Sequence, residues 1–493
     1  MKHSKFFSES SKYNLFLIIL FAVTVRILFF IGHIYSDDAY YNYLSFTLIK
    51  DSFLIDYFGY PIFVLRLGHL AVTALSFYFF GVNETASILF PFITSIGSIV
   101  VTFLIVKELE YSDKTALVAA FLTAVFSTDV VFASIAFPEA AAIFFVNIGL
   151  LFLIKATKNN KTSFSIITGV CLVVSFLFKE YVIYYIVLIL IYGIAYYLSK
   201  NKLKFKLALI PVAVFFIYIL LEGFCYYLIN NSFFFRFEIN ELNYQYCKYD
   251  FFPNTVSGEM GNTTGVVTAL FNQIVMVNLK AVFFRRFYLF LPALAFVLSI
   301  LSIKKKENLL LSFWFISILF LLVAFTHSIP EYRPVSLNRN WYIYPLILPS
   351  TAIAAVYFSK VKKLLLFTIL VVFTLFSFYM CMEYEEYFSK EENKNLKSFL
   401  IENKDRSIYS DHHSLYGLEF IRNGFKSLNI EKRLNSPGFS FDKIEKGSLI
   451  AVGKGNINEL LMQGYLFPDL SIFSGNDYEL VFTQKRFKFY KRL

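Results

Sequence analysis

The chain has 493 residues, of which 57% are hydrophobic, 20% aromatic and only 16% charged. Soluble globular domains carry roughly 25% charged residues, so this composition excludes a disordered chain, a coiled coil, a disulfide-rich secreted domain and an ordinary soluble enzyme. Apolar runs of roughly 20 residues, enough to cross a hydrocarbon core of about 30 Å, recur along the chain and indicate a polytopic membrane protein.

The net charge of +11 comes largely from short lysine clusters between apolar runs and is not gathered on one face or tail. Such clusters are typical of cytoplasmic loops, and we therefore expect no nucleic-acid partner. The clusters are Lys155/Lys158/Lys161, Lys200/Lys202/Lys204/Lys206, Lys304/Lys305/Lys306 and Lys360/Lys362/Lys363. The four cysteines form no CxxC pair and predict neither a zinc site nor a disulfide framework.

Eleven membrane spans are predicted, and the first is expected to be uncleaved, with the N-terminus in the cytoplasm. The spans are 14–34, 86–106, 115–134, 139–155, 163–178, 181–199, 207–229, 281–303, 308–326, 341–358 and 364–382. The apolar stretch 62–80 is the exception. If it crossed the membrane, every later loop would change side and the lysine clusters would lie outside, so we expect an interfacial or re-entrant segment.

This topology divides the chain into a membrane domain, residues 1–382, and an extracytoplasmic domain, residues 383–493. The outer loops 35–85 and 230–280 belong to the membrane domain. The tail is much more polar than the rest and is predicted to be a small α/β domain. Its expected elements are a helix over 388–402, short buried strands at 407–409 and 448–452, and a hairpin formed by 478–482 and 487–490.

An acidic pair, Asp37-Asp38, follows the first span directly. Adjacent carboxylates near a hydrocarbon wall repel each other and are costly to desolvate, which raises a pKa toward the range of a general base. The two could also hold a divalent cation. The alternative is structural, with Asp37 capping a helix that begins at Asp38.

Further polar residues are expected on the same outer side. Glu139 begins one span, Lys179 ends another, and His327 and Arg339 lie in the loop between two more. Basic side chains facing a cavity at membrane level are good ligands for a lipid phosphate.

Each of these basic residues also has a structural alternative. Lys179 could pair with Glu180 or snorkel, Arg339 could stack on Trp341 or Tyr342, and His327 could be an interfacial histidine. Arg26 lies well inside the first span, where it should face the bundle interior and a carboxylate. In the tail, Asp411-His412-His413 follows a predicted strand, and a solvated loop is favoured there over a metal site.

The order of these features resembles the GT-C superfamily of glycosyltransferases that use polyprenyl-phosphate sugars. The closest branch contains the protein O-mannosyltransferases and the lipid A aminoarabinose transferase. The residues that carry the resemblance, over roughly 10–380, are Arg26, Asp37-Asp38-Ala39-Tyr40-Tyr41, Pro61, Phe80-Gly81, Pro138-Glu139, Lys179, Arg339-Asn340-Trp341-Tyr342-Ile343-Tyr344-Pro345 and Pro349.

The resemblance implies an all-α membrane fold and an inverting sugar transfer from a polyprenyl or dolichyl phosphate to an extracytoplasmic protein, lipid or glycan. Asp37 matches the leading acid that activates the acceptor, and Asp38 stands where the family more often has Glu. Glu139 matches the second acidic position. The resemblance further implies that Lys179 and Arg339 hold the donor phosphate, with Tyr342 near the family's aromatic position. Family members differ in whether they need a divalent metal.

Two other classes of protein remain as alternatives. A transporter or flippase would show inverted repeats with paired helix breaks near the midplane, whereas the Gly and Pro interruptions here are scattered. A non-catalytic scaffold that presents the tail would not need Asp37, Lys179 and Arg339 on one side of the membrane.

Overall fold

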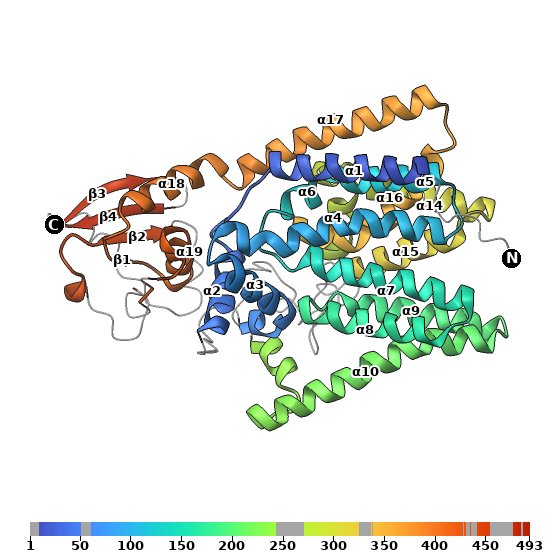
Figure 1. The fold of residues 1–493 in the computed structure, drawn as a ribbon, viewed down its shortest axis with the longest axis horizontal. Helices are drawn as coiled ribbons and strands as arrows, with labels where there is room; N and C mark the ends of the chain where they lie inside the picture. The colour runs from blue at the N-terminus through green and yellow to red at the C-terminus, as the bar shows by residue number, and fades with distance from the viewer. Residues whose placement is uncertain are drawn as a thin grey trace.

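The computed structural model describes residues 9–50, 61–242, 271–324, 337, 339–426, 428–429, 434, 441–453, 477–484 and 487–493. A helical bundle forms most of the molecule, and a small mixed domain stands at one end of it (Figure 1). The bundle helices are α1 (Glu9–Leu28), α4 (Glu84–Glu108), α5 (Asp113–Ala124), α6 (Ser127–Phe132), α7 (Glu139–Asn159), α8 (Thr162–Phe178), α9 (Val182–Leu198), α10 (Lys202–Asn230), α13 (Lys280–Phe284), α14 (Leu291–Lys305), α15 (Leu309–Ala324), α16 (Tyr344–Phe358) and α17 (Lys363–Tyr387).

Six of the described helices are long and apolar enough to cross a membrane on their own, namely α1, α4, α7, α10, α16 with the turn before it, and α17. Helices α8, α9 and α15 are apolar but shorter. Large apolar side chains on α10 and α17, such as Phe224 and Phe367, are exposed. A helix that contacts lipid needs an apolar outer face. The long apolar helices and these exposed side chains together show the fold of a multi-pass membrane protein.

Each predicted span contains a described helix, and three departures have local causes. The first helix ends at Leu28, and from Ile31 onward the N–H groups bond outside it: Ile31 donates to the Ser134 hydroxyl, Gly32 to the Ser134 carbonyl and His33 to the Glu84 carboxylate. The predicted span 115–134 is broken between α5 and α6. The predicted span 281–303 is interrupted by a 3-10 turn between α13 and α14.

Side chains define several helix ends. Asn83, Ser112 and Asn201 accept hydrogen bonds from backbone N–H groups in the first turns of α4, α5 and α10. Asn160 and Asn231 end α7 and α10 in the left-handed conformation. Asn adopts this conformation more readily than most residues, so each substitutes for the more usual glycine.

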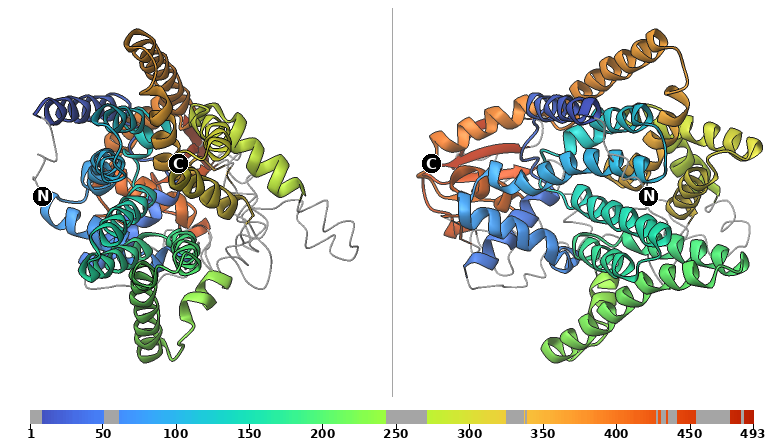
Figure 2. Two further views of the ribbon diagram at one scale, coloured as in Figure 1. Left: turned by 90° about the vertical axis from the view of Figure 1, so that its right-hand side faces the viewer. Right: turned by 45° about the vertical axis from the view of Figure 1, so that its right-hand side comes forward.

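The segment after α1 covers the end of the bundle that faces the C-terminal domain. It contains α2 (Asp37–Ile49), the 3-10 turn η1 (Pro61–Leu65) and α3 (Leu67–Phe80) (Figures 1 and 2). Helix α3 packs on α2, α4 and α8. Its 14 residues make it about 21 Å long, which is shorter than a hydrocarbon core of about 30 Å.

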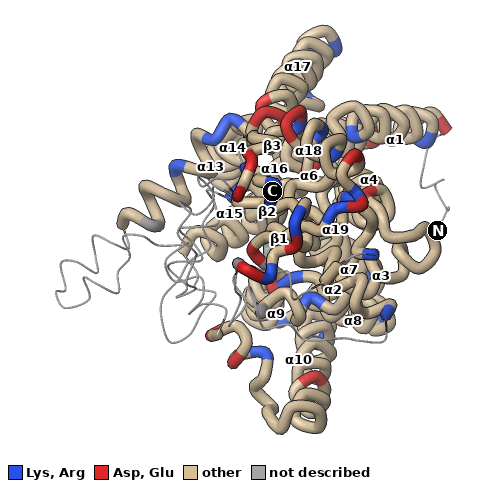
Figure 3. Tube along the Cα trace, turned by 90° about the vertical axis from the view of Figure 1, so that its left-hand side faces the viewer, with Lys and Arg blue, Asp and Glu red and all other residues tan. Residues whose placement is uncertain are grey.

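The C-terminal domain contains the helix and strands that the sequence predicts, and one further helix, α19, that it does not. The elements are α18 (Lys390–Glu402), β1 (Ile408–Tyr409), α19 (His412–Asn423), β2 (Leu449–Gly453), β3 (Tyr478–Thr483) and β4 (Phe487–Arg492). The sheet order is β1-β2-β4-β3, with β1 parallel to β2 and the other pairs antiparallel. Acidic and basic residues are interspersed over this domain (Figure 3).

The C-terminal domain is packed firmly on the membrane domain through α19. The rings of Tyr416 and Tyr43 stack with centroids 4.0 Å apart, and Phe420 contacts the ring of His33 at 5.1 Å. Lys397 forms an ion pair of 2.7 Å with Glu84. Helix α2 is therefore held between the bundle and the C-terminal domain.

Candidate functional site

The two acidic residues at the start of α2 have different environments. Asp38 is completely buried and accepts hydrogen bonds from the backbone N–H groups of Ile34, at 2.7 Å, and Ser36, at 2.8 Å. Its carboxylate also lies 2.6 Å from Nδ1 of His33. Burial alone would raise the pKa of Asp38, but His33 and the two N–H groups hold that pKa below its ordinary value.

Asp37 is the residue of the pair that remains available. It is partly exposed, and among the described residues we find no hydrogen bond or ion pair to its carboxylate. Helix α2 begins at Asp37 itself, with Ser36 in the capping position and no side-chain cap. The alternative that Asp37 caps this helix is therefore wrong, and Asp37 lies in the first turn of α2.

Lys179 and Glu139 form a buried ion pair where α8 ends and α7 begins. Their residues are 5% and 2% exposed. The Lys179 ammonium also lies over the rings of Tyr181, at 5.3 Å, and Tyr342, at 5.1 Å. Lys179 thus pairs with Glu139, not with the neighbouring Glu180, and three of the residues singled out from sequence meet at one point.

A second buried cation, Arg66, lies between α2 and the Lys179 pair. Its guanidinium is over the rings of Tyr41, at 5.6 Å, and Phe63, at 5.2 Å. Within the described part of the chain its Nε atom has no hydrogen-bond partner. Burial, together with the nearby charges of Arg66 and Lys179, lowers the pKa of His69 to about 3, so this imidazole is neutral.

These contacts connect the acidic helix with the basic site. Tyr41 lies four residues after Asp37 and hence on the same face of α2. The ring of Tyr41 contacts the ring of His69 at 4.7 Å, and His69 lies within electrostatic range of Lys179. Asp37 and Lys179 are therefore at the same end of the bundle, separated by a short row of polar and aromatic side chains.

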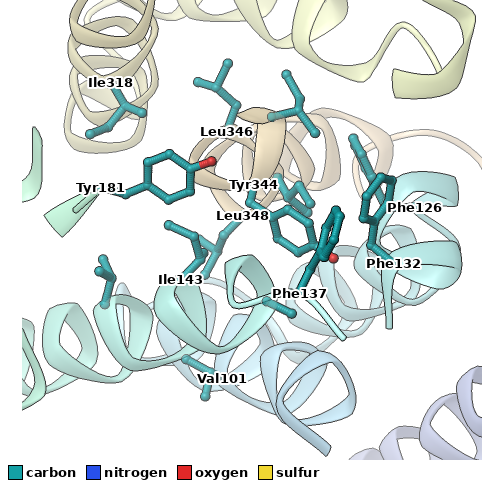
Figure 4. Close-up of a cluster of buried hydrophobic side chains, with 14 of the residues drawn as sticks. Val101, Phe126, Phe132, Phe137, Ile143, Tyr181, Ile318, Tyr344, Leu346 and Leu348 are labelled. Carbon is teal, nitrogen blue, oxygen red and sulfur yellow. The ribbon is translucent and has the colours of Figure 1, made fainter. Parts of the chain in front are cut away.

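Arg339 is brought toward this row by the turn η4 (Asn340–Ile343). The Arg339 guanidinium stacks on the ring of Trp341 at 5.7 Å. This stacking is the structural alternative that the sequence offers for Arg339. The N–H of Tyr342 donates to the Arg339 carbonyl at 3.1 Å, and Trp341 packs on Phe137 at 5.6 Å. Figure 4 shows Phe137 with Tyr181 and Tyr344 among the buried side chains around α16. His327 lies outside the described residues.

Arg26 takes the place that the sequence predicts, in the interior and beside a carboxylate. It is completely buried and forms an ion pair of 2.5 Å with Asp129. Ser95 accepts from Nε of Arg26 and donates to Asp129, both at 2.7 Å. This network joins α1, α4 and α6 below the candidate site, so its geometry shows a structural link between helices.

An apolar groove lies deeper in the bundle between α7, α9 and α15. It encloses about 50 Å³ and is lined mainly by aliphatic and aromatic side chains, among them Ile154, Ile189 and Trp314. Ile189 is seven residues, or about 10 Å, along α9 from Val182. The lining also includes Leu109, at the end of α4, and Leu310, at the start of α15, so the groove lies toward the end of the bundle away from Lys179.

No group of three or more metal-ligating side chains occurs among the described residues. Asp411 is buried and accepts from the N–H of Ser414, so it caps α19. The expected solvated loop at Asp411 is therefore a helix N-terminus, formed because an Asp before a helix can bond its free N–H groups.

The fold is similar to that of solved GT-C glycosyltransferases. ArnT from Cupriavidus metallidurans in the apo state aligns with a TM-score of 0.58 and 12% identity over 98% of both chains. ArnT bound to undecaprenyl phosphate aligns with a TM-score of 0.54 and 13% identity over 96% of this chain and 97% of that one.

Two further comparisons refine this result. Residues 67–222 match the family described as dolichyl-phosphate-mannose-protein mannosyltransferase. The apo oligosaccharyltransferase of Archaeoglobus fulgidus aligns with a TM-score of 0.51 and 14% identity over 85% of this chain, which spans 64% of that enzyme. A search of curated proteins finds no match. The predicted GT-C fold is confirmed.

Three features of the site were not predicted from the sequence. They are Arg66 as a buried cation, His33 as the partner of Asp38, and Asp129 as the partner of Arg26. The burial of Arg66 could have been predicted from its place within an apolar stretch, because an arginine there needs an interior or interfacial partner. The partners of Asp38 and Arg26 depend on tertiary contacts that no local pattern encodes.

Proposed function

We propose that this protein transfers a sugar from a polyprenyl or dolichyl phosphate to an acceptor hydroxyl outside the cytoplasm, with inversion at the anomeric carbon. The observation that carries the proposal is the buried cationic site of Lys179 and Arg66 next to the helix that presents Asp37. Acceptors of three kinds, protein, lipid and glycan, fit this chemistry.

The cations suit the leaving group. When the bond between the sugar and the phosphate breaks, negative charge grows on the phosphate, and preorganised donors in a water-poor site stabilise that charge strongly. Lys179 supplies an ammonium and Arg66 a guanidinium with an unused Nε. Arg339, on the turn that also carries Tyr342, would add a third cation, and Glu139 and Arg26 would support the arrangement from below.

The apolar groove suits the lipid part of such a donor. An isoprenoid chain needs a dry surface within the membrane domain, and the groove between α7, α9 and α15 offers apolar walls there. The ArnT neighbour was crystallised with undecaprenyl phosphate and an archaeal neighbour with dolichol-phosphate. A donor carried on a lipid phosphate of this kind would explain why the proposed catalytic site lies at the membrane surface.

The acidic pair suits the acceptor. Asp37 is the free carboxylate and would take the proton of the acceptor hydroxyl as that oxygen bonds to the anomeric carbon. Asp38 is fully engaged by His33 and two N–H groups, so its role would be to fix the turn that orients Asp37. Inversion follows when acceptor and phosphate lie on opposite sides of the sugar.

The test is the turnover of a lipid-phosphate sugar by purified Asp37→Asn protein. We expect activity at least about 100-fold lower, because a general base typically contributes 10²–10⁴ in rate, with unchanged binding of undecaprenyl phosphate. Asp405→Asn, at an exposed acid of the C-terminal domain, is the matched control. Activity near that of the unaltered protein would remove Asp37 from the base role.

A further inference from the structure

A second cluster of charged residues lies beside Arg66, where α8, α10 and the helical residues 235–242 meet. Arg236 donates two hydrogen bonds to Glu222, from Nε at 2.9 Å and from Nη2 at 2.7 Å. The Arg236 and Glu222 side chains are only 10% and 9% exposed. The guanidinium also lies 4.3 Å over the ring of Phe176.

This cluster borders a cavity of about 100 Å³ with both polar and aromatic walls. Glu180 and Asn240 add polar groups, and Phe176 and Tyr226 add aromatic faces. Nη1 of Arg236 has no hydrogen-bond partner within the described part of the chain, and the nearest acidic oxygen is Oε1 of Glu180 at 3.6 Å. The cavity is therefore bordered by a buried guanidinium whose Nη1 atom forms only the longer ion pair with Glu180.

The charges around the cavity balance. Burial would raise the pKa of Glu180, but the positive charges of Arg66 and Arg236 hold it below its ordinary value. The charged residues that line the cavity are Glu180, Glu222 and Arg236. Arg66 lies next to Glu180 outside this lining and supplies the second positive charge, while the nearby Lys179 is already paired with Glu139. A pocket with no net charge favours a neutral ligand, since a charged one would be desolvated without compensation.

The chemistry of the walls narrows the ligand further. Carboxylates accept hydrogen bonds, guanidinium groups donate them and an amide does both, so vicinal hydroxyls can be satisfied on several sides. Aromatic rings cover the apolar C–H face of the same molecule. These are the requirements of an uncharged sugar.

We propose that this pocket, bounded by Glu180, Arg236 and Asn240, binds the sugar of the lipid-linked donor and selects a neutral hexose. The inference rests on the function proposed above. Glu180 follows Lys179 directly in the chain, and the charge of Lys179 lies close enough to lower the pKa of the Glu180 carboxyl. A donor whose phosphate lies at Lys179 can therefore place its sugar beside Glu180.

The test compares the binding of three probes to the purified full-length protein, undecaprenyl phosphate and its mannosyl and glucosyl derivatives. We expect a mannosyl or glucosyl derivative to bind more tightly than the bare carrier phosphate. Asn240→Ala and Glu180→Gln should weaken binding of that derivative about tenfold, the loss expected for hydrogen bonds to charged groups. Neither change should alter binding of undecaprenyl phosphate. Glu238→Gln, an exposed acid of the same helical segment, is the matched control.

The outcomes separate the two proposals. If undecaprenyl phosphate does not bind, the function proposed for the protein fails. If it binds but neither hexose improves affinity, or if the two variants weaken all three probes equally, the sugar pocket is overturned while the carrier site stands.

Discussion

At the scale of single residues, Lys179 shows how one side chain can serve both the fold and the site. Its ion pair with Glu139 is buried, and the second Glu139 oxygen has no partner among the described residues. Removing the cation would leave a buried carboxylate uncompensated, which costs about 3–5 kcal/mol. A simple Lys179 variant would therefore lose stability and function together.

A paired substitution separates these effects. We expect Lys179→Met to lower the thermal stability of the purified protein, and Lys179→Met combined with Glu139→Gln to recover most of it, because the pair is removed as a unit. Neither protein should bind undecaprenyl phosphate as the unaltered chain does. Recovery of stability together with full carrier binding would show that the pair is only structural.

Asp38 carries a pH-dependent part of the stability. Its pKa in the folded protein is lower than the ordinary value of 3.8. The stabilisation that results is complete at pH values above the pKa of Asp38 in the unfolded protein. It disappears as the pH falls through the pKa of Asp38 in the folded protein. We expect Asp38→Asn to lower the melting temperature at pH 7 and to flatten its fall toward pH 3. The same slope in the variant and the unaltered protein would assign the acid sensitivity to another group.

At the scale of elements, the close approach of α8 to α10 depends on one glycine. A Cβ atom at Gly169 would lie 2.6 Å from Cβ of Val214 and 3.2 Å from Cα of Pro211. Gly193, on α9, is less restricted, since its Cβ would meet Ala208 at 3.4 Å. Both glycines face α10, and only one of them lacks room for a methyl group.

We expect Gly169→Ala to destabilise the protein by about 1–3 kcal/mol, the usual cost of overpacking. Gly193→Ala should have little effect or stabilise slightly, because alanine favours the helix. Thermal unfolding in one detergent compares the two variants directly. If both substitutions changed the melting temperature equally, α8 and α10 could move apart without loss of stability.

The helices were largely predictable because membrane spans are long apolar runs between charged loops. The interruption between α5 and α6 was not, since both helices are apolar and the break follows from tertiary contacts such as the hydrogen bond from Ser127 to the Phe287 carbonyl. The strands of the C-terminal domain were predictable because hydrophobic alternation with a short turn indicates a hairpin.

At the scale of the whole molecule, residues far apart in sequence form one site. Lys179, Glu139 and Tyr342 were singled out separately, and the structure brings them into contact. Their convergence followed from the order of spans, because alternate loops of a membrane protein share a side. The packing of the C-terminal domain on α2 could not be foreseen, since the Tyr416–Tyr43 stack joins two domains with no pattern in common.

The same charge distribution predicts the orientation in the membrane. The turn between α9 and α10, which contains Lys200, and helix α18 of the C-terminal domain lie at opposite ends of the molecule (Figure 1). Lysines in short loops stay in the cytoplasm, so the C-terminal domain should face outward. In a cysteine-free background, we expect Lys404→Cys to react with a membrane-impermeant maleimide on intact cells and Lys200→Cys to react only after permeabilisation. The reverse pattern would place the cationic site in the cytoplasmic leaflet and would contradict an extracytoplasmic acceptor.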